Sequence, residues 1–151
     1  MTSGNGKCEG PRLLPRHSIS RLIRAWLPPV AFYGALTVQS SFVLPSLAPS
    51  FAHSDKLLHA VVYLLLCFLI IRALRLAWWR PLSLRAASLY GLSAVVLMGA
   101  ADEWHQSWVP GRQASVADLF ADVLGAALAV ALAWGCHWWG SRSRWWEWLK
   151  L

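Results

Sequence analysis

Charged residues are scarce in this sequence, and the signatures of several protein classes are missing from it. Only 14% of its 151 residues are charged and 57% are hydrophobic, whereas about 25% charged is usual in soluble domains. The three cysteines form no CxxC pair, and neither an HExxH nor a GxSxG motif occurs. A soluble fold of this length cannot bury so much apolar surface, but a bilayer can. The composition therefore predicts a single-domain integral membrane protein.

Four stretches are long and apolar enough to be expected as transmembrane helices. A helix needs about 20 mostly apolar residues to cross roughly 30 Å of hydrocarbon. The four stretches cover residues 25–44, 57–74, 86–101 and 116–138. We therefore expect an all-α fold, a bundle of four transmembrane helices over residues 25–138. An N-terminal tail, 1–24, and an interfacial C-terminal tail, 139–151, would flank it.

Basic residues alternate along the chain in a way that predicts its orientation. Of the 14 Lys and Arg residues, only Lys56 and Arg112 lie in the first and third loops. The other twelve lie in the two terminal segments and around the second loop, and such segments stay in the cytoplasm. Both termini are therefore expected to be cytoplasmic. Because these bases flank apolar runs, the net charge of +7 does not predict a nucleic-acid partner.

Acidic residues have the opposite distribution, at the expected outer ends of the last three stretches. A charge at the centre of a membrane helix costs about 2.5–3.5 kcal/mol. Asp122 lies well inside the fourth stretch and is therefore expected to have a structural or functional role. The outer acids are Asp55, Asp102, Glu103, Asp118 and Asp122. The neighbouring polar residues are His53, Lys56, His59, Tyr63, His105, Gln106 and Arg112.

Helical spacing predicts that these residues face one another. Asp55, His59 and Tyr63 recur every four residues and therefore share one face of the second stretch. The corresponding stripe of the fourth stretch comprises Asp118, Asp122 and Gly125. A glycine in such a stripe allows a neighbouring helix to approach closely. We therefore expect the second and fourth helices to pack against each other through these stripes.

The loop before the fourth stretch contains turn and capping signals. Pro110-Gly111 predicts a turn. Ser115 is expected to cap the fourth helix, with Asp118 three residues later completing a capping box. Arg112 lies between these two signals, so its position should be well defined.

Two segments of the sequence resemble the motifs of the VanZ-like family of bacterial membrane proteins. DKLLHAVVY matches a DK-x-x-H-x-x-x-Y pattern, and DEWHQSWVPGR matches D-E-x-x-Q-x-x-x-P-G-R. The resemblance covers residues 39–127 and includes a D-x-x-x-N-x-x-G pattern in which Asp122 replaces the usual Asn. The family is named after a protein linked to teicoplanin resistance. The resemblance thus implies a bacterial inner-membrane protein acting at the cell envelope, and it implies no particular reaction.

The outer polar residues predict a site for an anionic lipid-linked or cell-envelope molecule in the outer leaflet. Candidate catalytic acids and bases are His59, Glu103, His105 and Asp118. Candidate substrate-binding residues are Lys56, Tyr63, Gln106 and Arg112, whose planar fork suits phosphate or carboxylate. If a divalent metal is the cofactor, its candidate ligands are Asp55, His59, Glu103, Asp118 and Asp122.

The sequence leaves open whether this site catalyses a reaction. A non-catalytic binding or scaffold protein, whose polar cluster only ties the helix ends together, is the main alternative. Five acids against two bases leave excess negative charge, which that alternative does not explain. A transporter is the third interpretation. One copy lacks the inverted repeats common in carriers, although a homodimer would supply symmetry.

Reporter fusions test the expected orientation. A reporter that works only in the cytoplasm should give a signal when fused at Leu151 or inserted between Arg75 and Arg80, because both lie among the retained bases. A signal at either place from a reporter that works only outside the cytoplasm would show that the orientation is wrong.

Overall fold

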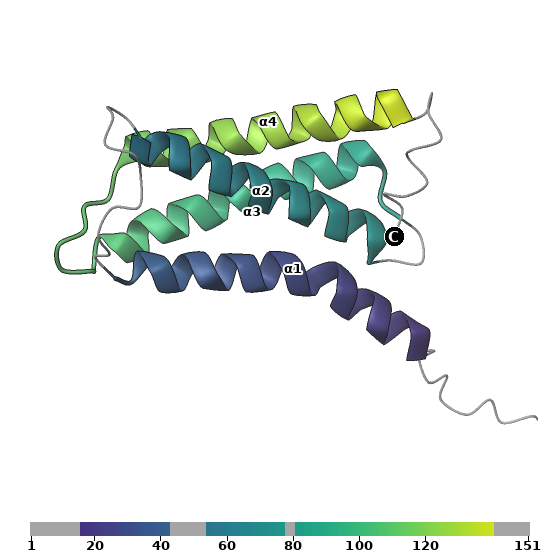
Figure 1. The fold of residues 1–151 in the computed structure, drawn as a ribbon, viewed down its shortest axis with the longest axis horizontal. Helices are drawn as coiled ribbons and strands as arrows, with labels where there is room; N and C mark the ends of the chain where they lie inside the picture. Colours follow the sequence, from purple (N-terminus) through teal and green to yellow (C-terminus); the bar gives the residue numbers. More distant parts are fainter. Residues whose placement is uncertain (1–15, 43–53, 78–80, 141–151) are drawn as a thin grey trace, which may run out of the picture.

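The chain forms a bundle of four α-helices. A computed structural model describes residues 16–42, 54–77 and 81–140. The helices are α1 (Arg16–Ser40), α2 (Ser54–Leu76), α3 (Leu84–Gln106) and α4 (Val116–Gly140). The described residues contain no strand, so the predicted all-α bundle is confirmed (Figure 1). His53 and most of the two predicted tails lie outside the described residues.

Three of the four helices in this part of the chain are long and apolar enough to cross a membrane. They are α2, α3 and α4 up to Trp139, with mean hydropathies of 2.4, 1.5 and 2.0. α1 begins at Arg16 rather than at the expected residue 25 and contains Pro28 and Pro29. Interior prolines kink helices because they lack an N–H donor, and the N-terminal part of α1 bends away from the bundle (Figure 1). A membrane-spanning role for α1 stays a prediction.

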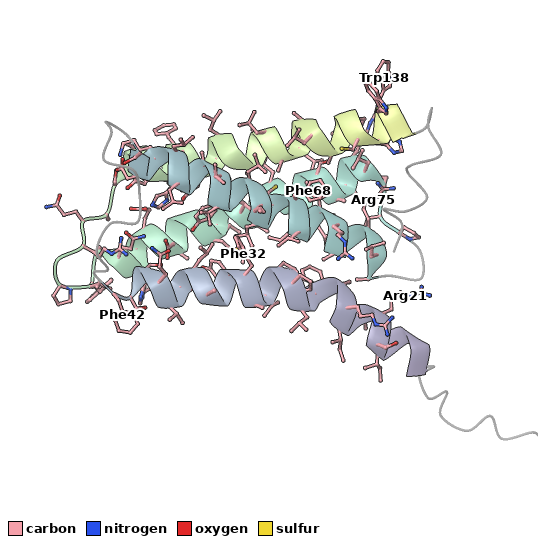
Figure 2. The ribbon with its side chains drawn as sticks, in the orientation of Figure 1. Arg21, Phe32, Phe42, Phe68, Arg75 and Trp138 are labelled. Atoms are coloured by element: carbon pink, nitrogen blue, oxygen red, sulfur yellow. The ribbon has the colours of Figure 1, made fainter. Side chains whose placement is uncertain are left out.

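Successive helices run in opposite directions, so each side of the bundle holds the C-termini of two helices and the N-termini of the other two (Figure 1). One side collects the C-termini of α1 and α3 and the N-termini of α2 and α4, and we call it the site end. In Figure 2, Phe42 lies at the site end, whereas Arg21 and Arg75 lie at the opposite end. The topology therefore separates the acidic part of the chain from most of its bases.

An apolar core between α2, α3 and α4 holds the bundle together below the site end. Leu66, Cys67 and Val95 are fully buried there, together with small residues of α4 such as Ala126 and Ala129. The thiol of Cys67 is part of this core, as expected for a small buried hydrophobe. Many large apolar side chains point outward instead, which accounts for the high hydrophobic content of a chain that faces lipid.

Helix α4 approaches α2 very closely at Gly125. A β-carbon added to Gly125 would overlap the backbone carbonyl oxygen of Ala60. Backbone atoms cannot move aside as a flexible side chain can, so only glycine fits at this position. The predicted facing of α4 toward α2 is confirmed, and the contact brings the polar stripes of both helices together.

We expect Gly125→Ala to lower the free energy of unfolding by about 1–3 kcal/mol, the usual cost of forcing an extra methyl into a packed interface. Gly135→Ala is the matched control, because it lies on the same helix and an added β-carbon meets nothing within 4 Å. Unfolding in bicelles measures both. Equal stability of the two variants would show that the close approach does not hold the helices.

Candidate functional site

Three side chains from three different helices meet at the centre of the site end. They are His59 of α2, Glu103 of α3 and Asp122 of α4, and we call them the three-helix cluster. One potential ligand atom from each lies within 4.8 Å of the other two. His59 Nδ1 and Asp122 Oδ1 are 3.0 Å apart and share a hydrogen bond. Asp122 is only 1% exposed and Glu103 only 8%, so both carboxyl groups are buried.

Glu103 is positioned by the start of α4. The backbone N–H of Ser115 donates to Glu103 Oε2 at 2.6 Å, and Ser115 Oγ accepts from the N–H of Asp118 at 3.3 Å. The predicted cap by Ser115 is therefore present. The predicted reciprocal bond from Asp118 is wrong, because Glu103 of the neighbouring helix takes its place. The hydrogen bond from Ser115 to Glu103 therefore ties α3 to α4.

Lys56 neutralises the two acids nearest to the surface of the site end. Its Nζ lies 2.9 Å from Asp118 Oδ1 and 3.0 Å from Asp55 Oδ2. Asp55 is 61% exposed along its side chain and lies outside the three-helix cluster. Of the five predicted metal ligands, the structure thus brings three together and pairs the other two with a lysine.

A second polar group joins α1 to α3. Asp102 accepts hydrogen bonds from Ser40 Oγ at 2.6 Å and from Gln106 Nε2 at 2.8 Å. Ser41 Oγ lies 3.0 Å from His105 Nε2. Two predicted site residues, Gln106 and His105, therefore lie in this group rather than in the three-helix cluster. The four-residue spacing of Asp102 and Gln106 indicates their bond, but no spacing pointed to Ser40.

The side chain of Arg112 binds backbone carbonyl groups at the end of α1. Its guanidinium donates from one nitrogen to the carbonyl oxygens of Gln39 and Phe42, at 3.2 and 3.0 Å. The predicted turn before it is present, since the N–H of Arg112 donates to the carbonyl of Val109 and Gly111 has a φ of 84°. Arg112 is thus held in a defined position, and part of its guanidinium donates hydrogen bonds to carbonyl groups at the end of α1.

Four buried polar atoms at the site end have no hydrogen-bond partner among the described residues. They are Glu103 Oε1, Asp122 Oδ2, Arg112 Nε and the hydroxyl of Tyr63, whose ring stacks on His59. This stacking places Tyr63 beside the three-helix cluster. Buried polar groups without partners are rare, and each calls for an explanation such as a catalytic role or a bound ion.

Gly99 makes room for Asp122, and sequence analysis did not single it out. A β-carbon there would lie 2.8 Å from Asp122 Oδ2. Because Gly99 and Glu103 are one turn apart on α3, the glycine opens the face of the helix that carries the glutamate. Any larger residue would push the aspartate away from this face.

The cluster combines one imidazole with two carboxyl groups. Such groups exchange protons with a bound molecule or hold a cation. Neither described cysteine contributes a nucleophile, because Cys67 lies in the apolar core and Cys136 near the other end of α4. The geometry supports acid–base or cation chemistry at this end of the bundle.

A protein-family model described as VanZ/LLP1 matches residues 2–139. The match includes α1, α2, α3, nearly all of α4 and every residue of the site end. No curated protein and no solved structure matches the chain. The match covers most of the 151 residues, and three helices have the length and hydropathy of membrane spans. The chain therefore belongs to the VanZ/LLP1 family of membrane proteins.

Proposed function

We propose that the chain binds an anionic cell-envelope or lipid-linked molecule at the site end, in the outer leaflet of the bacterial inner membrane. The observation that carries this proposal is the set of unpartnered buried atoms of Glu103, Asp122 and Tyr63, which would bond N–H and O–H groups of the molecule while Lys56 receives its anionic group. Burying a polar group without a hydrogen bond costs about 1–3 kcal/mol. A cluster that only tied helices together would gain stability by satisfying these atoms or by losing them.

The distribution of bases supports an outward site. Arg72, Arg75 and Arg85 lie at the end of α2 and the start of α3, on the side away from the cluster. Basic segments stay in the cytoplasm, which would direct the cluster outward. Exposed tryptophans occur near both ends of the bundle, Trp104 and Trp108 at the site end and Trp139 at the other. Tryptophan is enriched at membrane–water interfaces, so the cluster would lie near the headgroups.

Lys56 is the side chain best placed to receive an anionic group. Its side chain is 33% exposed, and its ammonium already bridges α2 to α4 through Asp118. An anion that replaced the exposed Asp55 as its second partner would leave this bridge intact. His59 and Glu103 lie deeper and would contact the remainder of the molecule, so binding with or without proton transfer fits the arrangement.

The alternative of a structural clamp has its own support. Arg112 satisfies carbonyls of α1, and Glu103 satisfies the first residue before α4. These bonds explain one oxygen of Glu103 and part of Arg112. They do not explain the second oxygen of Glu103 or the buried Asp122 Oδ2.

Resistance to teicoplanin-type glycopeptides is the phenotype expected from the family's name, and it provides an assay. In a susceptible bacterial host, the wild-type chain should reduce teicoplanin susceptibility. Glu103→Gln should return susceptibility to that of cells without the chain, while membrane level and thermal stability stay unchanged. The amide oxygen of Gln still accepts from Ser115, so only the charge is lost.

Arg112→Lys is the companion variant, because its side chain has a structural contact. Loss of the planar fork should lower thermal stability as well as function. If Glu103→Gln also lost function only in proportion to folded protein, the clamp interpretation would be correct. A wild-type chain that gave no protection would show that a teicoplanin-type molecule is not what it acts on.

A further inference from the structure

We infer that His59, Glu103 and Asp122 form a binding site for a divalent transition-metal ion such as Zn²⁺. The inference goes beyond the proposed function and rests on it only for what the ion would do for a bound molecule. Imidazole and carboxylate together suit Zn²⁺ and other divalent first-row transition metals, whereas Mg²⁺ and Ca²⁺ prefer oxygen ligands alone. Asp55 and Asp118 are not part of this ligand set, because Lys56 pairs with both.

The distances among the donor atoms come close to those of a metal site. Zinc bonds to nitrogen and oxygen measure about 2.0–2.2 Å, so two ligands of one tetrahedral ion lie roughly 3.3–3.6 Å apart. The three donor atoms lie within 4.8 Å of one another. Side-chain rotations that move these atoms by up to about an ångström would therefore bring all three within bonding distance.

Unpartnered oxygens give a second and independent reason. Glu103 Oε1 and Asp122 Oδ2 are buried and have no hydrogen-bond partner within the described ranges. The one bond that each carboxylate makes, to Ser115 or to His59, fixes its position and leaves its other oxygen available. Ligand groups in metal sites are commonly oriented by hydrogen bonds to groups outside the ligand set, as Glu103 is by Ser115.

Charge favours a cation at the same place. The two bases of the site end are already engaged, Lys56 with Asp118 and Arg112 with backbone carbonyls. Among the described residues, neither of these bases forms an ion pair with Glu103 or Asp122, and the imidazole of His59 is the one basic group bonded to either carboxylate. A divalent ion would neutralise both, and it would let an anionic group approach a part of the bundle that otherwise repels it.

Three protein ligands would leave at least one coordination position free. Catalytic zinc sites have three protein ligands and an open fourth position, whereas structural sites are closed by four. In the context of the proposed function, this open position would receive a phosphate or carboxylate oxygen of the envelope molecule. Lys56, bound to Asp118 on the adjacent turn of α4, would face the same group.

Zinc binding to the purified, tag-free full chain in nanodiscs tests the inference without any envelope molecule. After treatment with EDTA and its removal, titration calorimetry and elemental analysis should find about one Zn²⁺ per chain and no comparable binding of Mg²⁺. His59→Gln and Asp122→Asn should each weaken Zn²⁺ binding at least about tenfold, as the loss of metal-site residues generally does. Asp55→Asn is the matched acidic control and should bind as tightly as wild type.

Thermal unfolding keeps the test valid if a variant folds poorly. Zn²⁺ should raise the Tm of the wild type and of Asp55→Asn, and it should leave the Tm of His59→Gln unchanged. No binding by the wild type, or equal loss in all three variants, would overturn the metal site. Neither result bears on teicoplanin susceptibility. Conversely, normal Zn²⁺ binding by a chain that gives no teicoplanin protection would contradict the proposed function and leave the metal site standing.

Discussion

The polar end of this bundle depends on how closely α4 approaches α2. Gly125 lies against the backbone carbonyl of Ala60, and no other residue fits there. One turn closer to the site end, this approach brings Asp122 within hydrogen-bond distance of His59. In a membrane, helices gain little from hydrophobic association, so close packing of small residues and interhelical hydrogen bonds have to hold them together. The same contact thus supplies the packing and builds the cluster.

Four acids of the site end fall into two groups that differ in how many of their oxygens have a partner. Asp102 accepts one hydrogen bond from Ser40 of α1 and one from Gln106 of its own helix, and Asp118 pairs with Lys56 of α2, so each acid joins two helices. Glu103 and Asp122 each use one oxygen in the same way and leave the other without a partner in the described part of the chain. The first group explains why the helix ends stay together. The second group is what a ligand or ion would require.

The sequence predicted the helices and the facing stripes well, because both depend on local spacing. Apolar length predicted α2, α3 and α4, and the four-residue spacing of Asp118 and Asp122 predicted the face of α4 that contacts α2. Pairings between helices were harder, because they depend on the depth and rotation of each helix relative to the others. No periodicity could indicate that Ser40 bonds Asp102 or that Gly99 makes room for a carboxylate.

The resemblance and the geometry identified overlapping but different residues. Arg112 stands in the most specific part of the resemblance, yet its guanidinium binds backbone carbonyls of α1. A motif position therefore need not contact a ligand. Asp122, which departs from the family's usual Asn, is in contrast the most deeply buried acid of the site end. The departure adds an ionisable group where three helices converge, and this makes a cation site possible in this chain.

The central claim is that the buried carboxylates are retained for binding and not for stability. The free energy of unfolding of Asp122→Asn, measured in bicelles with EDTA present, tests this claim most directly. We expect a value equal to or above that of the wild type, because an amide removes a buried charge and still bonds His59. A loss of about 3–5 kcal/mol, the usual cost of breaking a needed buried ion pair, would contradict the account.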